Sequence, residues 1–133
     1  MRPLSDADAV FQSYGRCCRS ERFFEDFYTH FMGSSEAIRA KFVDTDMPAQ
    51  RHLLRAGLLW LIMYARGAPG GKLRDLGKSH SRGGYDIHPS WYGLWLDALM
   101  TTIRSHDPEY VPELERQWRA VMQGGIDVIS GAY

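Results

Sequence analysis

The chain has 133 residues, and its 16 Lys and Arg residues balance 16 Asp and Glu residues. A formal net charge of zero provides no electrostatic footprint for nucleic acid or for an anionic membrane surface. We therefore expect one domain, residues 1–133, whose function lies in an interior site. The aromatic content of 13% suits either a large core or a flat apolar ligand.

The cysteines and the apolar stretches predict a soluble, unprocessed, cytoplasmic protein. Cys17 and Cys18 are neighbours, which makes them a poor cross-link between distant segments. The longest apolar stretch, residues 56–65, is far shorter than the roughly 20 residues that span a bilayer. Residues 1–10 lack the apolar core of a signal peptide.

The N-terminal part of the chain follows helical periodicity and lacks β-branched runs between tight turns. Ser5 is a good residue to begin a first helix, which we place over residues 5–18. Ser20 can cap a second helix over residues 21–32, which carries a broad aromatic stripe on one side. A short third helix is predicted over residues 35–42.

A long fourth helix is predicted over about residues 48–65. Asp46 is a plausible N-cap, and Pro48 suits the first turn of a helix. One face carries a single polar residue at its N-terminal end and is otherwise apolar, with Gln50, Leu54, Gly57, Leu58 and Leu61 in register.

The remaining segments predict three more helices. Residues 72–80 form a short helix after a glycine-rich break, and Pro89 opens another helix that continues to about residue 104. The last helix follows residues 106–112, and its Gly124 and Gly125 permit a close helix crossing. The prediction is an all-α domain of seven or eight helices without a strand.

Familiar catalytic and metal-binding motifs do not occur in the sequence. The chain has five histidines, and no two of them show the H-x-x-x-H spacing of a zinc site. A phosphate-binding loop, a dinucleotide-binding glycine motif and a zinc-binding cysteine cluster are also missing. Any chemistry must therefore come from isolated residues that converge in space.

Several weak signals nevertheless occur in a distinctive order along the chain. They are Tyr28, Phe42, "DTDMPAQ" with Gln50, "LGKSH" with His80, "RGGY", "WYGLWLDAL" and "QWRAVMQGGIDVI". In order and spacing the chain resembles the bacterial single-domain globins over nearly its whole length. The resemblance implies a globin-like fold of seven to eight helices around a pocket for haem b, iron protoporphyrin IX. A three-over-three helical arrangement is favoured, and the truncated two-over-two form is the alternative.

The resemblance implies that His80 is the protein ligand to the haem iron. A haem takes one neutral imidazole from the protein, and the opposite face stays open for a gas. Gly83 and Gly84 would let the chain bend beneath the porphyrin. The alternative for His80 is a surface or capping histidine. We expect His88 near the haem edge or in solvent, His52 facing away from the pocket, and His30 and His106 on the surface.

On the opposite face of the haem the resemblance places Tyr28 and Gln50, with Leu53 and Leu54 closing the pocket. Tyr and Gln side chains can both donate hydrogen bonds to a bound gas and slow its escape. Phe42 would stack on the haem, and Tyr85 and Ile87 would pack against its edge. The alternatives are core roles for the two aromatic residues Tyr28 and Phe42, and a solvated position for Gln50.

The mouth of the pocket is less well defined by the sequence. Met47 is a candidate lining residue. Arg51, Lys78 and Arg82 are candidate partners for the haem propionates, and spacing does not choose among them.

The resemblance implies a haem protein that reversibly binds O₂, NO or CO. Dioxygenation of NO is an extension that needs an electron donor, and the sequence has no flavin or nicotinamide motif, so a separate reductase would be required. A peroxidase-type side activity is also conceivable chemistry for a haem. The alternatives are a haem-based sensor and a haem-free helical interaction module. The physiological gas and the oligomeric state stay open.

Overall fold

The computed structural model describes residues 4–133. The described chain forms seven helices and no strand, as predicted. The helices are α1 (Asp6–Cys17), α2 (Phe23–Gly33), α3 (Glu36–Lys41), α4 (Met47–Ala65), α5 (Gly71–His80), α6 (Trp91–His106) and α7 (Pro112–Ser130).

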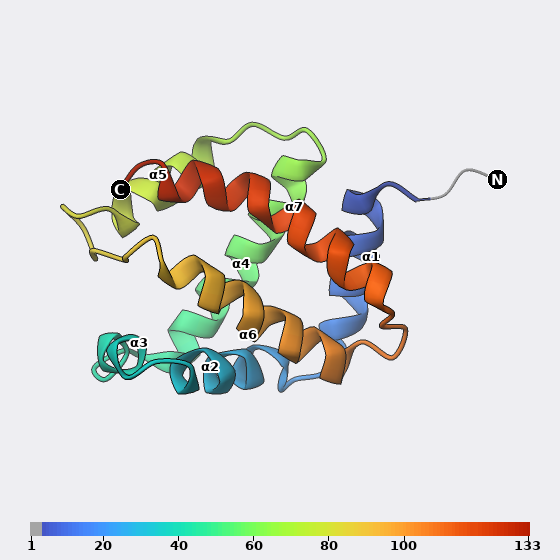
Figure 1. Cartoon of the computed structure of the whole chain (residues 1–133), viewed down its shortest axis with the longest axis horizontal. Coiled ribbons are helices and arrows are strands. Elements are labelled where there is room, and N and C mark those ends of the chain that lie inside the picture. Colours follow the sequence, from blue (N-terminus) through green and yellow to red (C-terminus); the bar gives the residue numbers. More distant parts are fainter. Residues whose placement is uncertain (1–3) are drawn as a thin grey trace.

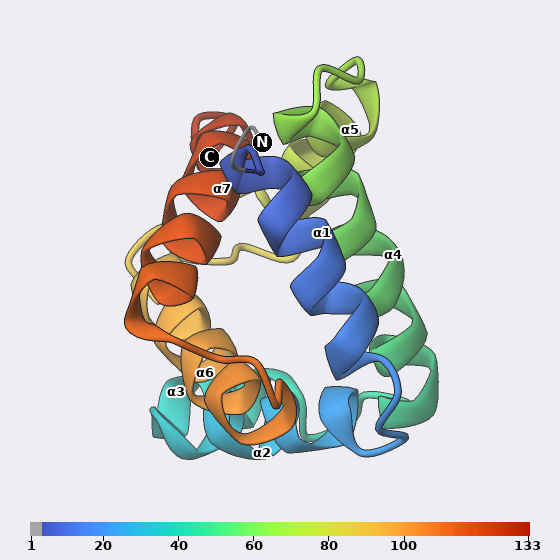
Figure 2. The same ribbon diagram turned by 90° about the vertical axis from the view of Figure 1, so that its right-hand side faces the viewer.

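The helices form two layers. Figure 2 shows α1, α4 and α5 on one side of the molecule, facing α6 and α7, with α2 closing the lower end. Helix α2 packs mainly on α6, and α7 packs on α1, α4 and α5 (Figure 1). The short α3 lies beside α2. Both α1 and α5 are regular helices, of 12 and 10 residues.

Two predicted helix starts have the expected chemistry. The Ser5 hydroxyl accepts a hydrogen bond from the backbone N–H of Asp8 at 3.1 Å, which caps α1. Asp46 Oδ1 accepts one from the N–H of Ala49 at 3.2 Å, and Pro48 lies in the first turn of α4. Local side-chain chemistry therefore fixes where these helices begin.

Two other predicted starts were wrong by a few residues. Ser20 does not cap α2, which begins at Phe23; the Ser20 hydroxyl instead accepts from the N–H of Arg22 at 3.2 Å, within the preceding turn. Helix α6 begins at Trp91 and not at Pro89, because residues 88–90 form a turn closed by a backbone hydrogen bond between residues 91 and 88.

Helix α7 approaches α4 and α5 closely at Gly125. A Cβ atom at Gly125 would overlap the side chain of Leu61 on α4 and lie 3.2 Å from Leu73 Cδ1 on α5. At Gly124, next to it, a Cβ atom would meet no atom within 4 Å. The predicted close crossing is confirmed, and it depends on Gly125 alone of the pair.

A buried polar cluster joins α1 to the turn between α6 and α7. Arg16 donates from Nε and Nη2 to the two carboxylate oxygens of Asp107, at 2.7 and 2.9 Å. The Ser13 hydroxyl also donates to Asp107, and Ser13 in turn accepts from the indole N–H of Trp118 at 2.9 Å. Every polar side-chain atom buried in the described residues has a hydrogen-bond partner.

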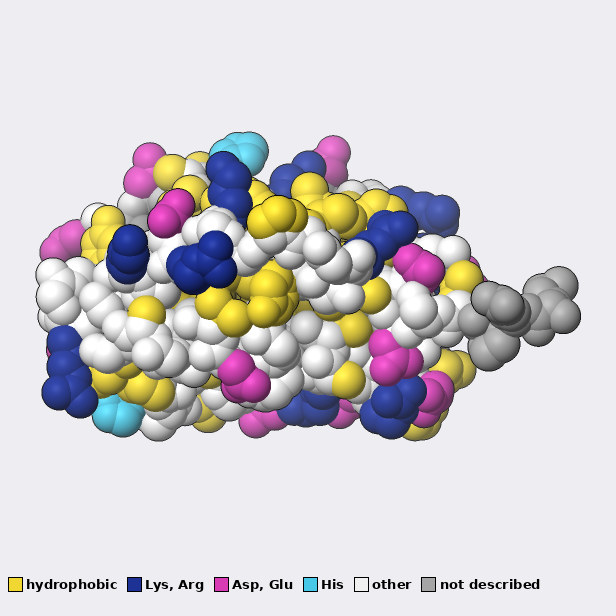
Figure 3. All heavy atoms as spheres, turned by 90° about the horizontal axis from the view of Figure 1, so that it is seen from above, with side chains coloured by type: hydrophobic (Ala, Val, Ile, Leu, Met, Phe, Trp, Pro, Cys, Tyr) yellow, Lys and Arg dark blue, Asp and Glu magenta, His cyan; other side chains and the backbone are white. Residues whose placement is uncertain are grey.

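Charges of both signs occur together on the surface. Seen from above, Lys and Arg side chains alternate with Asp and Glu side chains, and apolar side chains show near the middle of this face (Figure 3). No helix of residues 4–133 combines the length and the apolar character needed to cross a bilayer.

Candidate functional site

A cavity of about 710 Å³ lies inside the helical layers, with walls from α2, α4, α5, α6, α7 and the loops after α3 and α5. Most of its lining side chains are aliphatic or aromatic. The structure brings eight of the residues predicted for the site to this cavity: Tyr28, Phe42, Gln50, Leu53, Leu54, His80, Tyr85 and Ile87. They come from five separate segments of the chain, which only the tertiary fold unites.

His80 is the last residue of α5, and its ring is held by the backbone of its own helix. Nδ1 lies 2.9 Å from the carbonyl oxygen of Leu76 and 3.1 Å from the hydroxyl of Ser79. Because a carbonyl only accepts hydrogen bonds, Nδ1 carries the proton in this arrangement. Nε2 then has a free lone pair, and it makes no hydrogen bond to the described residues.

The surroundings of His80 favour the neutral imidazole. Burial lowers the pKa of His80, and this effect outweighs the hydrogen bond to the Leu76 carbonyl, which raises the pKa. A neutral ring with one nitrogen tethered to a carbonyl is the form in which histidine ligates metals. A ring held in this way could ligate a metal ion bound in the cavity.

Tyr28 and Gln50 form a polar pair in the same cavity. Gln50 Nε2 donates to the Tyr28 hydroxyl oxygen at 3.1 Å. The hydroxyl lies 3.5 Å from the backbone carbonyl of Gln50, which is long for an O–H donor, so its proton is weakly held there. Burial raises the pKa of Tyr28 to about 12, which keeps the phenol protonated near neutral pH. The pair therefore offers one O–H donor to a ligand.

The apolar walls include aromatic side chains in edge contact. Phe42 packs edge-on against Tyr28 and Phe31, with ring centroids 5.5 and 6.1 Å apart. Leu54 is buried in the wall, whereas Leu53 and Tyr85 are 61% and 71% exposed and lie at the rim. The cavity thus has a closed apolar interior and a mouth lined partly by exposed apolar side chains.

A scan against protein-family models and a search of curated proteins found no match to the chain. Among solved structures, the chain is similar to protein PA3967 from Pseudomonas aeruginosa PAO1, which is described as structurally highly homologous to a human hemoglobin. The two chains are 56% identical with a TM-score of 0.95, and the match covers 97% of this chain and 98% of that chain. The chain belongs to the bacterial globins.

Membership in this family implies a haem, and the residues of this globin fit one. The cavity volume of about 710 Å³ lies within the roughly 300–1,000 Å³ of typical small-molecule and cofactor sites. Its apolar walls suit a porphyrin ring, and His80 would supply an unprotonated nitrogen for iron. Tyr28 and Gln50 add polar groups to the cavity, which a polar ligand bound beside the porphyrin could use.

The structure corrects the predictions for the pocket mouth. None of Met47, Arg51, Lys78 and Arg82 lines the cavity. The basic residue that does line it is Lys41, which the sequence analysis missed. Lys41 directly precedes Phe42, and nothing else in the sequence distinguishes it from the other basic residues.

The other histidines of this globin lie away from the cavity. His30, His52 and His88 are exposed, as predicted for solvent-facing residues. His106 was wrongly predicted to be a surface residue: its Nε2 lies 2.7 Å from Asp26 Oδ2, and its ring packs edge-on against Phe23. It joins the end of α6 to α2.

Proposed function

We propose that this globin binds haem b through His80 and reversibly binds a diatomic gas, with O₂ as the first candidate. The proposal rests above all on the Nδ1–H···O contact between His80 and Leu76, which leaves Nε2 free at an apolar cavity. A bound haem would supply an iron with one open coordination position for the gas. His80 would hold the iron, and the tether to Leu76 would orient the ring and make Nε2 more basic.

Tyr28 and Gln50 are the proposed gas-stabilising pair. The Tyr28 hydroxyl is the better placed donor, because Gln50 already donates to its oxygen and so orients the phenol proton away from that bond. Leu54 and Phe42 line the same cavity and would exclude water, which strengthens a hydrogen bond to a polar ligand.

The first test is haem binding with the ligand removed. The purified chain is titrated with haem, and the absorption spectra of the ferric, ferrous and CO-bound forms are recorded. We expect one haem per chain with a histidine-ligated spectrum, and loss of that spectrum in His80→Ala. His88→Ala is the matched control and should keep it, since His88 is exposed and outside the cavity. A wild-type spectrum that survives in His80→Ala contradicts the proposal.

The second test is gas dissociation. Tyr28→Phe keeps the ring and removes the hydroxyl, and a lost hydrogen bond of about 1–3 kcal/mol corresponds to a roughly 5- to 150-fold faster O₂ dissociation. CO, which is less polar when bound, should leave at nearly the wild-type rate. Stopped-flow displacement measures both rates. An unchanged O₂ rate in Tyr28→Phe would exclude the hydroxyl as the stabilising donor.

Dioxygenation of NO is a second candidate that the Tyr28 donor favours, because a pocket that retains O₂ gives NO time to reach it. The proposal includes a separate reductase as electron donor, because the sequence carries no flavin or nicotinamide motif. An NO electrode measures consumption in the presence of O₂ and an added reductase. Tyr28→Phe should consume NO more slowly than the wild type at low O₂.

A further inference from the structure

Lys41 spans the mouth of the cavity. It is the last residue of α3, and its Nζ donates a hydrogen bond to the backbone carbonyl of Tyr85 at 2.8 Å. Tyr85 belongs to the loop that follows His80 along the chain. One side chain therefore links the two segments that face each other across the opening, residues 41–45 and residues 81–88.

The charge of Lys41 is distinctive at this place. Among the described residues that line the cavity, it is the only Lys or Arg, and none is an Asp or Glu. A lysine ammonium has three N–H donors, and the contact with the Tyr85 carbonyl uses one of them. Two donors and a full positive charge are thus left beside a cavity with mostly apolar walls.

The other cations near this loop have different contacts. The guanidinium of Arg82 lies over the ring of Tyr133, 4.7 Å from its centroid. Lys78 is exposed on α5 and does not line the cavity. Lys41 is therefore the cation that a ligand in this cavity would meet.

We propose that Lys41 is the carboxylate-binding residue of the pocket, with two roles at one atom. Nζ pairs with a carboxylate of the bound porphyrin, and its bond to the Tyr85 carbonyl holds the loop wall that carries Tyr85 and Ile87. The inference rests on the proposed haem function and deepens it, because it makes the site selective for porphyrins with free carboxylates. A carboxylate is the partner of choice for an ammonium at the edge of an apolar site.

The loop has a second tether, which makes Lys41 removable without unfolding the wall. Tyr133 Oη donates to Asp86 Oδ1 at 2.6 Å, and backbone bonds run from Tyr85 and Ile87 to the end of α5. The substitution Lys41→Met keeps most of the aliphatic stem and removes only the ammonium. We expect Lys41→Met to fold and to keep the cavity.

The experiment compares two proteins, each with two ligands. Wild type and Lys41→Met are each loaded with haem and with haem dimethyl ester, in which both carboxylates are neutral. The rate of porphyrin transfer to an excess of scavenger apoglobin is then measured. We expect the ester to leave wild type about two- to fivefold faster than haem, as for a partly exposed ion pair. In Lys41→Met the ratio of the two rates should fall most of the way to one.

Lys78→Met is the matched control, since it removes the same charge from a residue outside the cavity. It should keep the wild-type ratio. The ratio in wild type should also shrink at about 1 M salt, where charge pairs are strongly screened.

Equal rates for haem and ester in wild type would overturn the inference, and so would a ratio in Lys41→Met that matches wild type. Either outcome leaves the proposed haem function intact, because the porphyrins still bind. A chain that binds neither porphyrin overturns both the inference and the haem function.

Discussion

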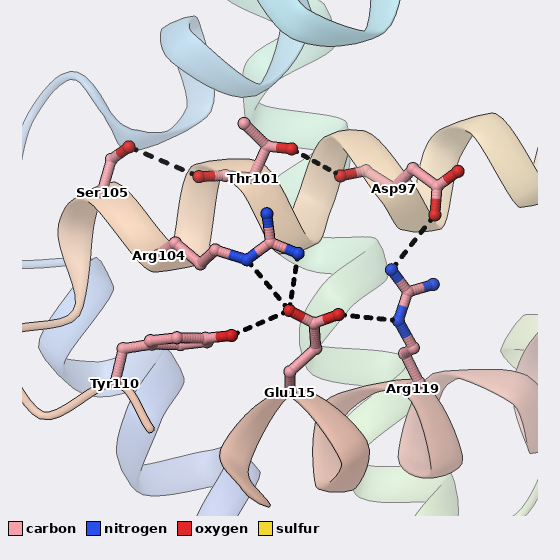
Figure 4. Close-up of polar contacts among 7 residues, drawn as sticks. All are labelled: Asp97, Thr101, Arg104, Ser105, Tyr110, Glu115 and Arg119. Atoms are coloured by element: carbon pink, nitrogen blue, oxygen red, sulfur yellow. Dashed lines mark hydrogen bonds and ion pairs between the residues drawn. The ribbon is translucent and has the colours of Figure 1, made fainter. Parts of the chain in front are cut away.

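The two ends of the molecule are built on opposite principles. Where α1 meets the α6–α7 turn, polar groups are saturated: Asp107 is 4% exposed and accepts from Arg16, Ser13 and the backbone N–H of Glu109. Near it, Glu115 gathers Arg104, Tyr110 and Arg119 around one carboxylate (Figure 4). At this end the protein satisfies its own groups.

At the cavity end, several polar side chains have donor or acceptor atoms that make no strong hydrogen bond within the protein. His80 keeps a free Nε2, the Tyr28 proton is weakly held, and Lys41 uses one donor of three. Apolar Leu53 and Tyr85 are largely exposed at the rim. The difference is that the protein satisfies its polar groups at one end and leaves spare bonding capacity at the other. Substitutions at the two ends should therefore separate stability from ligand binding.

The largest expected loss of stability is at Asp107. Asp107→Asn leaves the Arg16 guanidinium, 14% exposed, with only the 3.6 Å contact to Glu109, and removing one partner of a largely buried pair costs roughly 3 kcal/mol. Equilibrium urea unfolding measures the loss, and the folded fraction should still bind haem. Asp97→Asn, at a largely exposed carboxylate on α6, is the control and should change stability little. A loss at Asp107 as small as at Asp97 would undo the contrast between the two ends.

The helix crossing between the two ends gives the next effect. Gly125→Ala pushes a methyl group into Leu61, and such overpacking costs about 1–3 kcal/mol. Leu61 also lines the cavity, so its displacement should be visible as a shifted haem absorption band. Gly124→Ala has open space and should stabilise the helix by up to about 1 kcal/mol. Urea unfolding of both variants tests the pair; losses of equal size would contradict the crossing.

Acid should weaken the Asp107 end selectively. Burial raises the pKa of Asp107, but hydrogen bonds from Arg16, Ser13 and the Glu109 N–H outweigh it and hold the pKa below its usual value. The stabilisation is therefore complete above the ordinary carboxyl range, near about pH 4, and is lost as the pH falls through the lower folded value. The gap in unfolding free energy between wild type and Asp107→Asn should close on acidification. A gap independent of pH excludes this linkage.

Local signals in the sequence predicted that the helices form and roughly where they lie. Helical periodicity and short-range capping at Ser5 and Asp46 predicted the elements, because these interactions join residues three or four positions apart. The starts at Phe23 and Trp91 were missed because Ser20 and Pro89, the residues expected to begin these helices, lie in the turns that precede them. The all-α class followed from helical periodicity, and the resemblance to the bacterial globins named the family that the similar structure supports.

Contacts between residues far apart in the chain could not be predicted from the sequence. Lys41 meets Tyr85 across 44 positions, and His106 meets Asp26 across 80, so no local pattern announces either contact. The cavity residues named from the resemblance do come together, yet the resemblance could not choose the basic residue at the mouth. That choice depends on how α3 and the loop after α5 face each other.

The smallest expected loss of stability is at the polar cluster around Glu115. This cluster compares a partly exposed charge with the buried charge of Asp107. Glu115 accepts from Arg104 at 2.7 Å and from Tyr110 at 2.9 Å, but the Arg104 side chain is 48% exposed. Solvent screens such pairs, so Glu115→Gln should cost about 1 kcal/mol or less, and less still at high salt. Glu113→Gln, two residues earlier on α7 and more exposed, is the matched control and should cost less. Urea unfolding at low and high salt measures both. A salt-independent loss as large as that of Asp107→Asn would mean that Glu115 acts as a buried charge, because only a pair sheltered from solvent resists screening.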